Sequence, residues 1–402
     1  MRRLAVAILG VLAISGLSLG PANARAADFH AWLESFRAEA AAAGISKSVM
    51  DKAFLDLKAD PHVIDLNDNQ PEFTRAIWDY LDTAVSDKRV ADGRQAFDQN
   101  KALLTKIGAD YGVDPEVIVA IWGIESSYGA LPGNYDAIQS LATLAWKGRR
   151  SAYGRAQLIG ALKIIQNGYA TREQLKGSWA GALGQTQFVP TTYLAYAVDA
   201  DGDGHRDIWT NLGDIFASTA NYLAASRYAS GDPWGVEVTL PAGFDYSLAD
   251  SDTYRALAEW SASGVAALAG ELVEQFDPNL RARVLLPAGS KGPAFLVFQN
   301  FEAILHYNNS TAYALAVGLL AQRIKGAETP MVTAAWPRDD RPLTLDERKA
   351  LQQALKDKGF DPGPVDGVIG AGTKRALRAW QKSRNLPPDG YASGAVLQAL
   401  IS

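Results

Sequence analysis

The carboxyl side chain of Glu125 occupies a position where a helix would normally place a hydrophobic residue. Glu125 follows Ile118 by seven residues and Trp122 by three, so on a helix it shares their face. Contact with Trp122 and the negative end of the helix dipole both disfavour the ionised carboxylate and raise its pKa. A carboxylic acid that stays protonated near neutral pH can protonate the leaving oxygen of a glycosidic bond. A Glu paired with an Arg, or turned to water at the helix end, fits the same spacing.

The helix that must position Glu125 is predicted within residues 112–129. Asp114 can accept the free amides of the helix start, and Pro115 suits the first helical position. Gly129 can end the helix in a left-handed conformation. The sequence therefore predicts a helix of about four turns, with Glu125 in its last turn.

Two further segments could hold a ligand near this helix. Arg149 and Arg150 could clamp an anionic or hydroxyl-rich ligand, or they could both lie in solvent. Gln187 can donate to and accept from a sugar, and it follows a stretch rich in small residues, 180–184. Tight packing around the glycines is the alternative explanation for this stretch.

Acidic residues alternate with small ones after position 198, in the pattern of a calcium loop with glycine at its sixth position. Asp199, Asp201 and Asp203 are the first candidate ligands. Thr210 stands where that motif has a bidentate Glu, and Asp214 could close a longer loop instead. The sequence leaves open a structural calcium ion or an acidic turn that needs no metal.

The N-terminal 26 residues have the pattern of an export signal. Arg2 and Arg3 precede an apolar run, residues 4–19, that is short for a membrane span, and Ala26 ends a small-x-small cleavage site. Removal of this segment takes three Arg with it and changes the net charge from −5 to −8. The chain has no Cys, which excludes disulfides and a lipid-modified Cys. We expect a soluble periplasmic protein with no membrane anchor, and the acidic charge argues against nucleic acid as a ligand.

The 402 residues are enough for two or three domains, and we expect a mainly α (α+β) fold. Residues 27–106 have helical periodicity, and the stripe that contains Tyr80 is interpreted as a packing face. Strand signals occupy 236–240, 282–286 and 294–298, which predicts a small β insertion before helix resumes at 300–320. Residues 326–342 are predicted to be a linker. A capping box at Thr344 opens a compact three-helix module, residues 343–402.

In this order the segments resemble the lytic murein transglycosylase B family, followed by a C-terminal peptidoglycan-binding domain. The matching catalytic-region residues are Gln70-Pro71-Glu72-Phe73, Gly123-Ile124-Glu125-Ser126, Gly148-Arg149-Arg150, Ala180-Gly181-Ala182-Leu183-Gly184, Gln187-Phe188-Val189-Pro190, Asp203-Gly204-His205, Ala220-Asn221-Tyr222, and Tyr307-Asn308-Asn309-Ser310 with Tyr313. The matching tail residues include Asp366-Gly367, Trp380-Gln381 and Asp389-Gly390.

The resemblance implies a lysozyme-like helical catalytic domain, residues 27–325, with Glu125 as the sole catalytic acid and base. Glu125 would protonate the oxygen between MurNAc and GlcNAc and then take the proton of the MurNAc 6-hydroxyl. That hydroxyl would attack the anomeric carbon, so that 1,6-anhydro-MurNAc forms without water. The substrate's own N-acetyl group would stabilise the positive charge, where an ordinary glycosidase uses a second carboxylate.

The resemblance also assigns sugar-binding roles, to Arg149, Arg150, Gln187, Tyr222, Tyr307, Asn308 and Tyr313. It implies no required cofactor and a structural calcium ion in some members, for which Asp199, Asp201, Asp203 and Asp214 are the candidates here. Peptidoglycan strands are the expected partner, and candidate protein partners are those that synthesise or hydrolyse the wall. Two alternatives stay open: a hydrolytic muramidase, with Asp136 or Asp199 as the missing base, and an inactive wall-binding scaffold.

Overall fold

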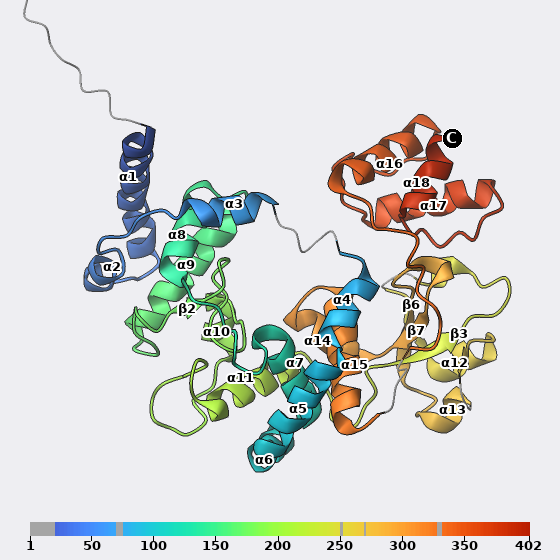
Figure 1. Ribbon diagram of the computed structural model, residues 1–402, viewed down its shortest axis with the longest axis horizontal. Helices are drawn as coiled ribbons and strands as arrows, with labels where there is room; N and C mark the ends of the chain where they lie inside the picture. Colours follow the sequence, from blue (N-terminus) through green and yellow to red (C-terminus); the bar gives the residue numbers. More distant parts are fainter. Residues whose placement is uncertain (1–20, 70–74, 250–251, 269–270, 328–331) are drawn as a thin grey trace, which may run out of the picture.

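The computed structural model describes residues 21–69, 75–249, 252–268, 271–327 and 332–402 (Figure 1). The predicted export signal up to residue 20 and the Gln70-Pro71-Glu72-Phe73 motif lie outside these residues. None of the described helices is both long and apolar enough to cross a bilayer. The expected mainly α fold, with a small β insertion and a helical C-terminal module, is confirmed.

One helical lobe combines the start of the chain with a segment more than 100 residues later, and α8 lies against both α3 and α9 (Figure 1). A two-residue antiparallel pair, β1 (Tyr135–Asp136) with β2 (Lys176–Gly177), lies beside α8. The helices of this lobe are α1 (Pro21–Ala42), α2 (Lys47–Ala53), α3 (Pro61–Asn69), α8 (Ala137–Lys147), α9 (Ser151–Gln166) and α10 (Pro190–Tyr196).

The central bundle surrounds α7 (Pro115–Ser126), which contacts α5, α6, α11 and α15. Residues 118–121 of α7 are fully buried, so this helix is hydrophobic on every side along its middle. A single hydrophobic core joins the bundle to the first lobe. The other helices of the bundle are α4 (Ile77–Ala84), α5 (Asp87–Gln99), α6 (Lys101–Tyr111), α11 (Leu212–Ala225), α14 (Gln299–Tyr307) and α15 (Thr311–Lys325).

The helix expected over 300–320 is interrupted, which the sequence interpretation did not anticipate. It breaks into α14 and α15, with residues 308–310 between them. The Ser310 hydroxyl accepts a hydrogen bond from the amide of Tyr313 and so caps α15. The break places Tyr307 at the end of one helix and Tyr313 at the start of the next.

The β insertion forms a five-stranded antiparallel sheet of order β4-β6-β7-β3-β5. Its three longer strands lie where the sequence predicted strands, and they have a separate core that includes Trp260 and Phe298. The elements are β3 (Gly235–Thr239), η2 (Tyr246–Ala249), β4 (Arg255–Ala256), α12 (Leu257–Ala262), β5 (Ala266–Ala267), α13 (Leu272–Gln275), β6 (Arg281–Leu285), η3 (Gly289–Lys291) and β7 (Ala294–Val297).

The C-terminal module consists of α16 (Leu345–Asp357), α17 (Ala371–Ser383) and α18 (Gly394–Ile401) around its own small core. Thr344 and Glu347 form the predicted capping box. Two buried glutamine side chains hold the two Asp-Gly turns. The side-chain oxygen of Gln352 accepts from the backbone amide of Gly367, and that of Gln381 accepts from the backbone amide of Gly390. These matching residues of the tail therefore stabilise the module's own loops.

Residues 332–342, here called the strap, lie against the sheet and α4. The amides of Thr333 and Ala334 donate to the Glu237 carboxylate at 2.7 and 2.8 Å. Arg338 makes two hydrogen bonds to Asp82 of α4, at 2.8 and 2.9 Å. A small hydrophobic cluster joins the strap to α4, the sheet and the C-terminal module; its members are Ala76, Ile77, Trp78, Ala288, Trp336 and Tyr391.

Candidate active site

The start of α7 agrees with the prediction for Pro115 at the first helical position but not with the prediction that Asp114 caps the helix. Pro115 occupies the first turn, whereas the Asp114 side chain makes no capping hydrogen bond to the helix amides. Its carboxylate instead accepts from the Tyr228 hydroxyl at 2.9 Å and the Ser230 hydroxyl at 2.6 Å. Asp114 therefore ties the end of α11 and its following loop to the base of the catalytic helix.

The helix ends earlier than Gly129, where the sequence interpretation placed its end. Ser127 adopts the left-handed conformation with φ of 51°, and its amide donates to the carbonyl of Gly123 at 3.0 Å. Gly129, also left-handed, lies in the following turn. The early end leaves Glu125 within the last two residues of α7, next to a half-buried turn.

Trp122 forms a fixed wall one helical turn before Glu125. Its indole N–H donates to Gln185 Oε1 at 2.7 Å, and Gln185 Nε2 donates to the carbonyl of Trp209 at 2.6 Å. The indole also packs edge-on against Phe216, with 5.1 Å between ring centroids. Trp122 is thereby held on two sides, as a precise site requires.

The Glu125 carboxyl is in the environment that the sequence predicted. Part of the residue's surface is open, but the surrounding protein desolvates the carboxyl and raises its pKa from 4.5 to about 7. The Tyr313 hydroxyl opposes this shift and lowers the pKa. A protonated Glu125 is therefore well populated near neutral pH.

Tyr313 and Tyr307 flank Glu125 from either side of the break between α14 and α15. Their rings lie 11° from parallel with centroids 6.5 Å apart. Burial, and after it the charge of Glu125, raise the pKa of both hydroxyls. The Tyr307 hydroxyl donates to the carbonyl of Thr186 at 2.8 Å. The Tyr313 hydroxyl is buried and has no partner at hydrogen-bonding distance among the described residues, although it lies close enough to Glu125 to affect its pKa.

Tyr222 extends this group of aromatic rings along α11. Its ring packs edge-on against Tyr307 and Tyr196, with centroid distances of 5.1 and 4.6 Å. The Tyr222 hydroxyl donates to the carbonyl of His306 at 2.6 Å. Tyr222 and Tyr313 therefore both lie beside Tyr307, and the hydroxyls of Tyr307 and Tyr313 are affected by the Glu125 charge.

Gln187 is held on the same loop as Thr186, in a left-handed conformation with φ of 52°. Its side-chain amide donates to two carbonyls, those of Pro132 at 2.8 Å and Gly184 at 2.9 Å. These bonds fix which end of the amide is nitrogen, so that Oε1 is left as an acceptor. Gln187 therefore lies on a loop that Tyr307 and Pro132 both hold.

Tyr80 of α4 is a site residue that the sequence interpretation missed. It packs against the main core as predicted, but its hydroxyl also senses Glu125, since burial and then the Glu125 charge raise its pKa to about 12. A stripe of apolar and aromatic residues at helical spacing has the same appearance in a core and in a cleft wall. Only its hydroxyl group distinguishes Tyr80 from the other residues of this stripe.

The other expected ligands are exposed residues. Arg149 and Arg150 are exposed at the start of α9; Arg149 donates to the carbonyl of Asn67 at 2.9 Å, and Arg150 lies over the ring of Tyr153. Neither arginine is among the charges that shift the pKa of Glu125. Asn308 is exposed in the break after α14, next to Tyr307.

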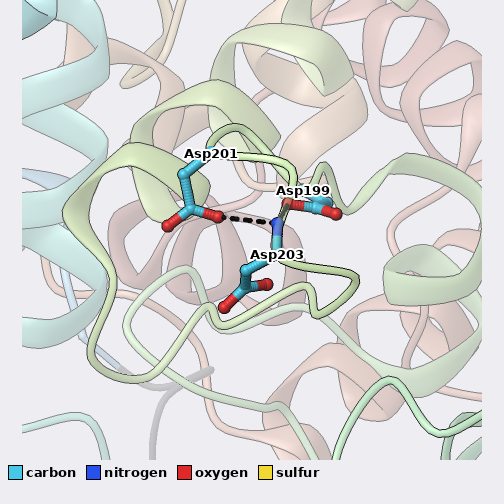
Figure 2. A group of neighbouring side chains, drawn as sticks. All are labelled: Asp199, Asp201 and Asp203. Atoms are coloured by element: carbon cyan, nitrogen blue, oxygen red, sulfur yellow. Dashed lines mark hydrogen bonds between the residues drawn. The ribbon is translucent and has the colours of Figure 1, made fainter.

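The acidic loop gathers three of its four predicted ligands. Asp199, Asp201 and Asp203 each place a carboxylate oxygen within 4.8 Å of the others (Figure 2). Oxygen donors of this kind suit calcium. Asp214 is fully buried outside this trio, and its two oxygens accept from the backbone amides of Ala200 at 2.8 Å and Asp207 at 2.6 Å. The prediction that Asp214 joins the other three as a ligand is therefore wrong in this structure, because its carboxylate holds the loop backbone.

The chain matches two protein-family models. The family described as the transglycosylase SLT domain matches residues 28–322, and a peptidoglycan binding domain matches residues 344–400. The membrane-bound lytic murein transglycosylase B of Escherichia coli (strain K12) is 30% identical over 297 residues, which cover 70% of this chain and 79% of that protein.

Solved structures give the same assignment. SltB3 from Pseudomonas aeruginosa, in complex with NAG-NAM-pentapeptide, is 50% identical with a TM-score of 0.89, covering 92% of this chain and 99% of that chain. Its complex with NAG-anhNAM-pentapeptide gives a TM-score of 0.88 at 50% identity, over 93% and 99% of the two chains. Escherichia coli Slt35 in complex with calcium is 28% identical, with a TM-score of 0.62, over 75% and 94%. The family expected from the sequence motifs is confirmed, and the chain belongs to the transglycosylase SLT family of peptidoglycan lytic transglycosylases, with a C-terminal peptidoglycan-binding domain.

Proposed function

We propose that this chain cleaves the β-1,4 bond between MurNAc and GlcNAc and releases 1,6-anhydro-MurNAc ends, with Glu125 as the only catalytic acid and base. The observation that carries this proposal is the Glu125 carboxyl, whose pKa is raised to about 7 by burial without any contribution from another carboxylate among the described residues. A retaining or inverting hydrolase needs a second carboxylate across the sugar.

In the first step, neutral Glu125 gives its proton to the bridging oxygen while the bond from that oxygen to the anomeric carbon breaks. In the second step, the Glu125 carboxylate takes the proton of the MurNAc 6-hydroxyl, whose oxygen bonds to the anomeric carbon. Glu125 ends protonated again and no water is consumed. The substrate's N-acetyl group stabilises the positive charge between the two steps.

Either Asp136 or Asp199 would have to supply the missing base of a hydrolytic mechanism, and both carboxylates are engaged elsewhere. Asp136 pairs with Arg172 at 2.6 Å and caps α8 through the amide of Gln139. Asp199 accepts amides within its own loop, including that of Gly202 at 2.7 Å. Both observations favour the transglycosylase over the muramidase. The test is mass spectrometry of digested sacculi, where anhydro ends lack the mass of one water and hydrolytic ends do not.

For the sugar cleft we propose different roles for the polar and aromatic groups. Gln187 Oε1 would accept from an amide or hydroxyl of the sugar, because the Gln187 nitrogen is occupied. The rings of Tyr222 and Tyr307 would contact sugar faces, the Tyr313 hydroxyl would hold Glu125, and Asn308 would bind at the open end. Arg149 and Arg150 would contact the polymer outside the cleft. KM measured on variants of each residue tests these roles.

We propose a weak structural calcium site at Asp199, Asp201 and Asp203, supported by their mutual approach and by the calcium complex of Slt35. Bound calcium would stiffen the loop before α11 and take no part in the reaction. We also propose export to the periplasm with cleavage after Ala26, then a catalytic unit at 27–325, a connection at 326–342 and a wall-binding module at 343–402. N-terminal sequencing of the periplasmic fraction tests the cleavage position.

A further inference from the structure

A cavity lies where the sheet, the strap and the C-terminal module meet. Its volume is about 360 Å³, which is within the range of ligand pockets, about 300–1,000 Å³. Tyr246 and Lys291 line it from the sheet, Asp340 from the strap, and Leu386, Tyr391 and Ala399 from the module. Each of the three parts therefore supplies a wall.

The walls of this cavity are fixed by hydrogen bonds between the parts. The Asp389 carboxylate of the module accepts from the amide and the hydroxyl of Ser290 in η3, at 2.7 and 2.8 Å. Its other oxygen accepts from Gln381 Nε2 at 2.7 Å and from the amide of Tyr391 at 2.9 Å. Since both oxygens are occupied, Asp389 serves as the link between the module and the sheet.

The lining combines apolar surface with one cation, Lys291, and two carboxylates, Asp340 and Asp389, of which Asp389 has both oxygens engaged. The rings of Tyr246 and Tyr391 and the side chains of Leu386 and Ala399 give an apolar lining. Lys291 is exposed and has no ion-pair partner among the described residues. The Asp340 carboxylate uses one oxygen for the amide of Ala395, at 3.1 Å.

The apolar surface and the charges of the cavity favour one chemical component of the cell-wall polymer, its peptide, over the other, its sugar chain. A short peptide with methyl side chains, a free carboxylate and a free amine offers a partner to the lining, to Lys291 and to Asp340 together. A neutral sugar chain leaves both charges unmatched, which disfavours it relative to a charged ligand.

We propose that this cavity binds the peptide stem of peptidoglycan, at a site distinct from the one around Glu125. The proposal rests on the proposed function in one respect, namely that the ligand is part of the same polymer. The stem carboxylate pairs with Lys291, its free amine pairs with Asp340, and its alanine methyl groups contact the rings of Tyr246 and Tyr391.

The experiment uses the full chain with Glu125→Gln, so that no substrate is turned over. Isothermal titration with the tetrapeptide L-Ala-γ-D-Glu-meso-diaminopimelyl-D-Ala is compared with a peptide-free β-1,4-linked GlcNAc oligomer. We expect the tetrapeptide to bind, and Lys291→Ala or Ala399→Trp to weaken it at least tenfold, because the first removes the cation and the second fills the cavity. Lys325→Ala and Ala371→Trp change exposed residues of the same types elsewhere and should leave its affinity unchanged.

Absence of tetrapeptide binding, or binding that neither cavity variant weakens, would overturn the proposal. Lys291 is exposed, so its variant stays folded even if the Ala399→Trp protein does not. Release of anhydro products from sacculi by the unmodified chain is measured separately. If those products form and the tetrapeptide does not bind, the cavity proposal fails while the proposed function stands.

Discussion

Tyr307 and Tyr313 belong to different helices, yet their rings are nearly parallel, 11° apart, with 6.5 Å between their centroids. The break at residues 308–310 produces this arrangement, since a continuous helix would carry the two side chains to different faces. Both hydroxyls sense the charge of Glu125. The interruption of the helix is therefore part of the proposed active site.

Glu125→Gln removes the proton donor and leaves the shape of the side chain unchanged. We expect the clearing of sacculi to slow by about 10²–10⁴-fold, the usual contribution of general acid and base catalysis. Binding of the protein to sacculi should be retained. Turbidity and sedimentation assays measure the two quantities, and clearing at the unmodified rate would reject Glu125 as the acid.

The rate should fall as pH rises through about 7, because the first step needs the protonated Glu125. Stability follows the same group. A folded-state pKa above the ordinary 4.5 means that its stabilising contribution is complete below about pH 4.5 and is lost as pH rises to about 7. The loss amounts to up to roughly 3 kcal/mol, since one pKa unit corresponds to about 1.4 kcal/mol. Glu125→Gln should abolish it, which denaturant unfolding at pH 4.5 and pH 8 measures.

Tyr313→Phe should raise the pKa of Glu125, because the Tyr313 hydroxyl lowers it. The alkaline limb of the kcat/KM profile is then expected at higher pH than in the unmodified enzyme. Tyr222→Phe is the matched control: its hydroxyl bonds to the carbonyl of His306 and is not among the groups that shift Glu125. A limb displaced equally in both variants would contradict a specific role for Tyr313.

In the acidic loop the Asp214 carboxylate has a structural role, whereas Asp199, Asp201 and Asp203 are the proposed metal ligands. Asp214→Ala should destabilise the fold by about 2–4 kcal/mol, since it removes a fully buried carboxylate and leaves the backbone amides of Ala200 and Asp207 without their acceptor. Asp201→Asn changes an exposed residue and should leave the Tm in EDTA nearly unchanged. In the unmodified chain, millimolar calcium should raise the Tm, and Asp201→Asn should remove that rise. A calcium-dependent rise that persists in the variant would place the ion elsewhere.

Glu237→Ala should release the strap from the sheet, because its nearly buried carboxylate accepts the amides of Thr333 and Ala334. We expect faster proteolytic cutting within residues 326–342 and a loss of about 1–3 kcal/mol. Arg338→Ala breaks an exposed pair with Asp82 and should cost no more than about 1 kcal/mol. Equal resistance to proteolysis in Glu237→Ala and the unmodified chain would show that the strap is held in other ways.

Local patterns in the sequence were sufficient for most of the helices and for the environment of Glu125. Periodicity placed Glu125 beside Trp122, and the burial of its carboxyl follows from that position. The Thr344 capping box and the strands around Val236 and Val284 are also short-range signals, and the structure has them. In each case the interacting residues are neighbours in sequence or share one repeating face.

Two of the errors concern carboxylates that accept from unexpected donors, which for Asp114 lie far away in the sequence and for Asp214 lie in the preceding loop. Asp114 had the right type for a helix cap, but Tyr228 and Ser230 occupy its carboxylate. Asp214 had the right type for a metal ligand, but the amides of Ala200 and Asp207 occupy it. A carboxylate goes to the donors that the tertiary structure brings to it, and a sequence pattern does not contain those donors.

The attachment of the strap at Glu237 and Asp82 has a consequence for how the enzyme meets an insoluble substrate. A flexible tether lets its two ends explore a wide volume, and the effective concentration between them changes slowly with tether length. The strap, fixed at both points, holds the C-terminal module at one distance from Glu125 and in one orientation. If the C-terminal module binds the polymer as proposed, the polymer reaches Glu125 from a constant direction, and the dimensions of the protein itself set the position of the cut along the strand.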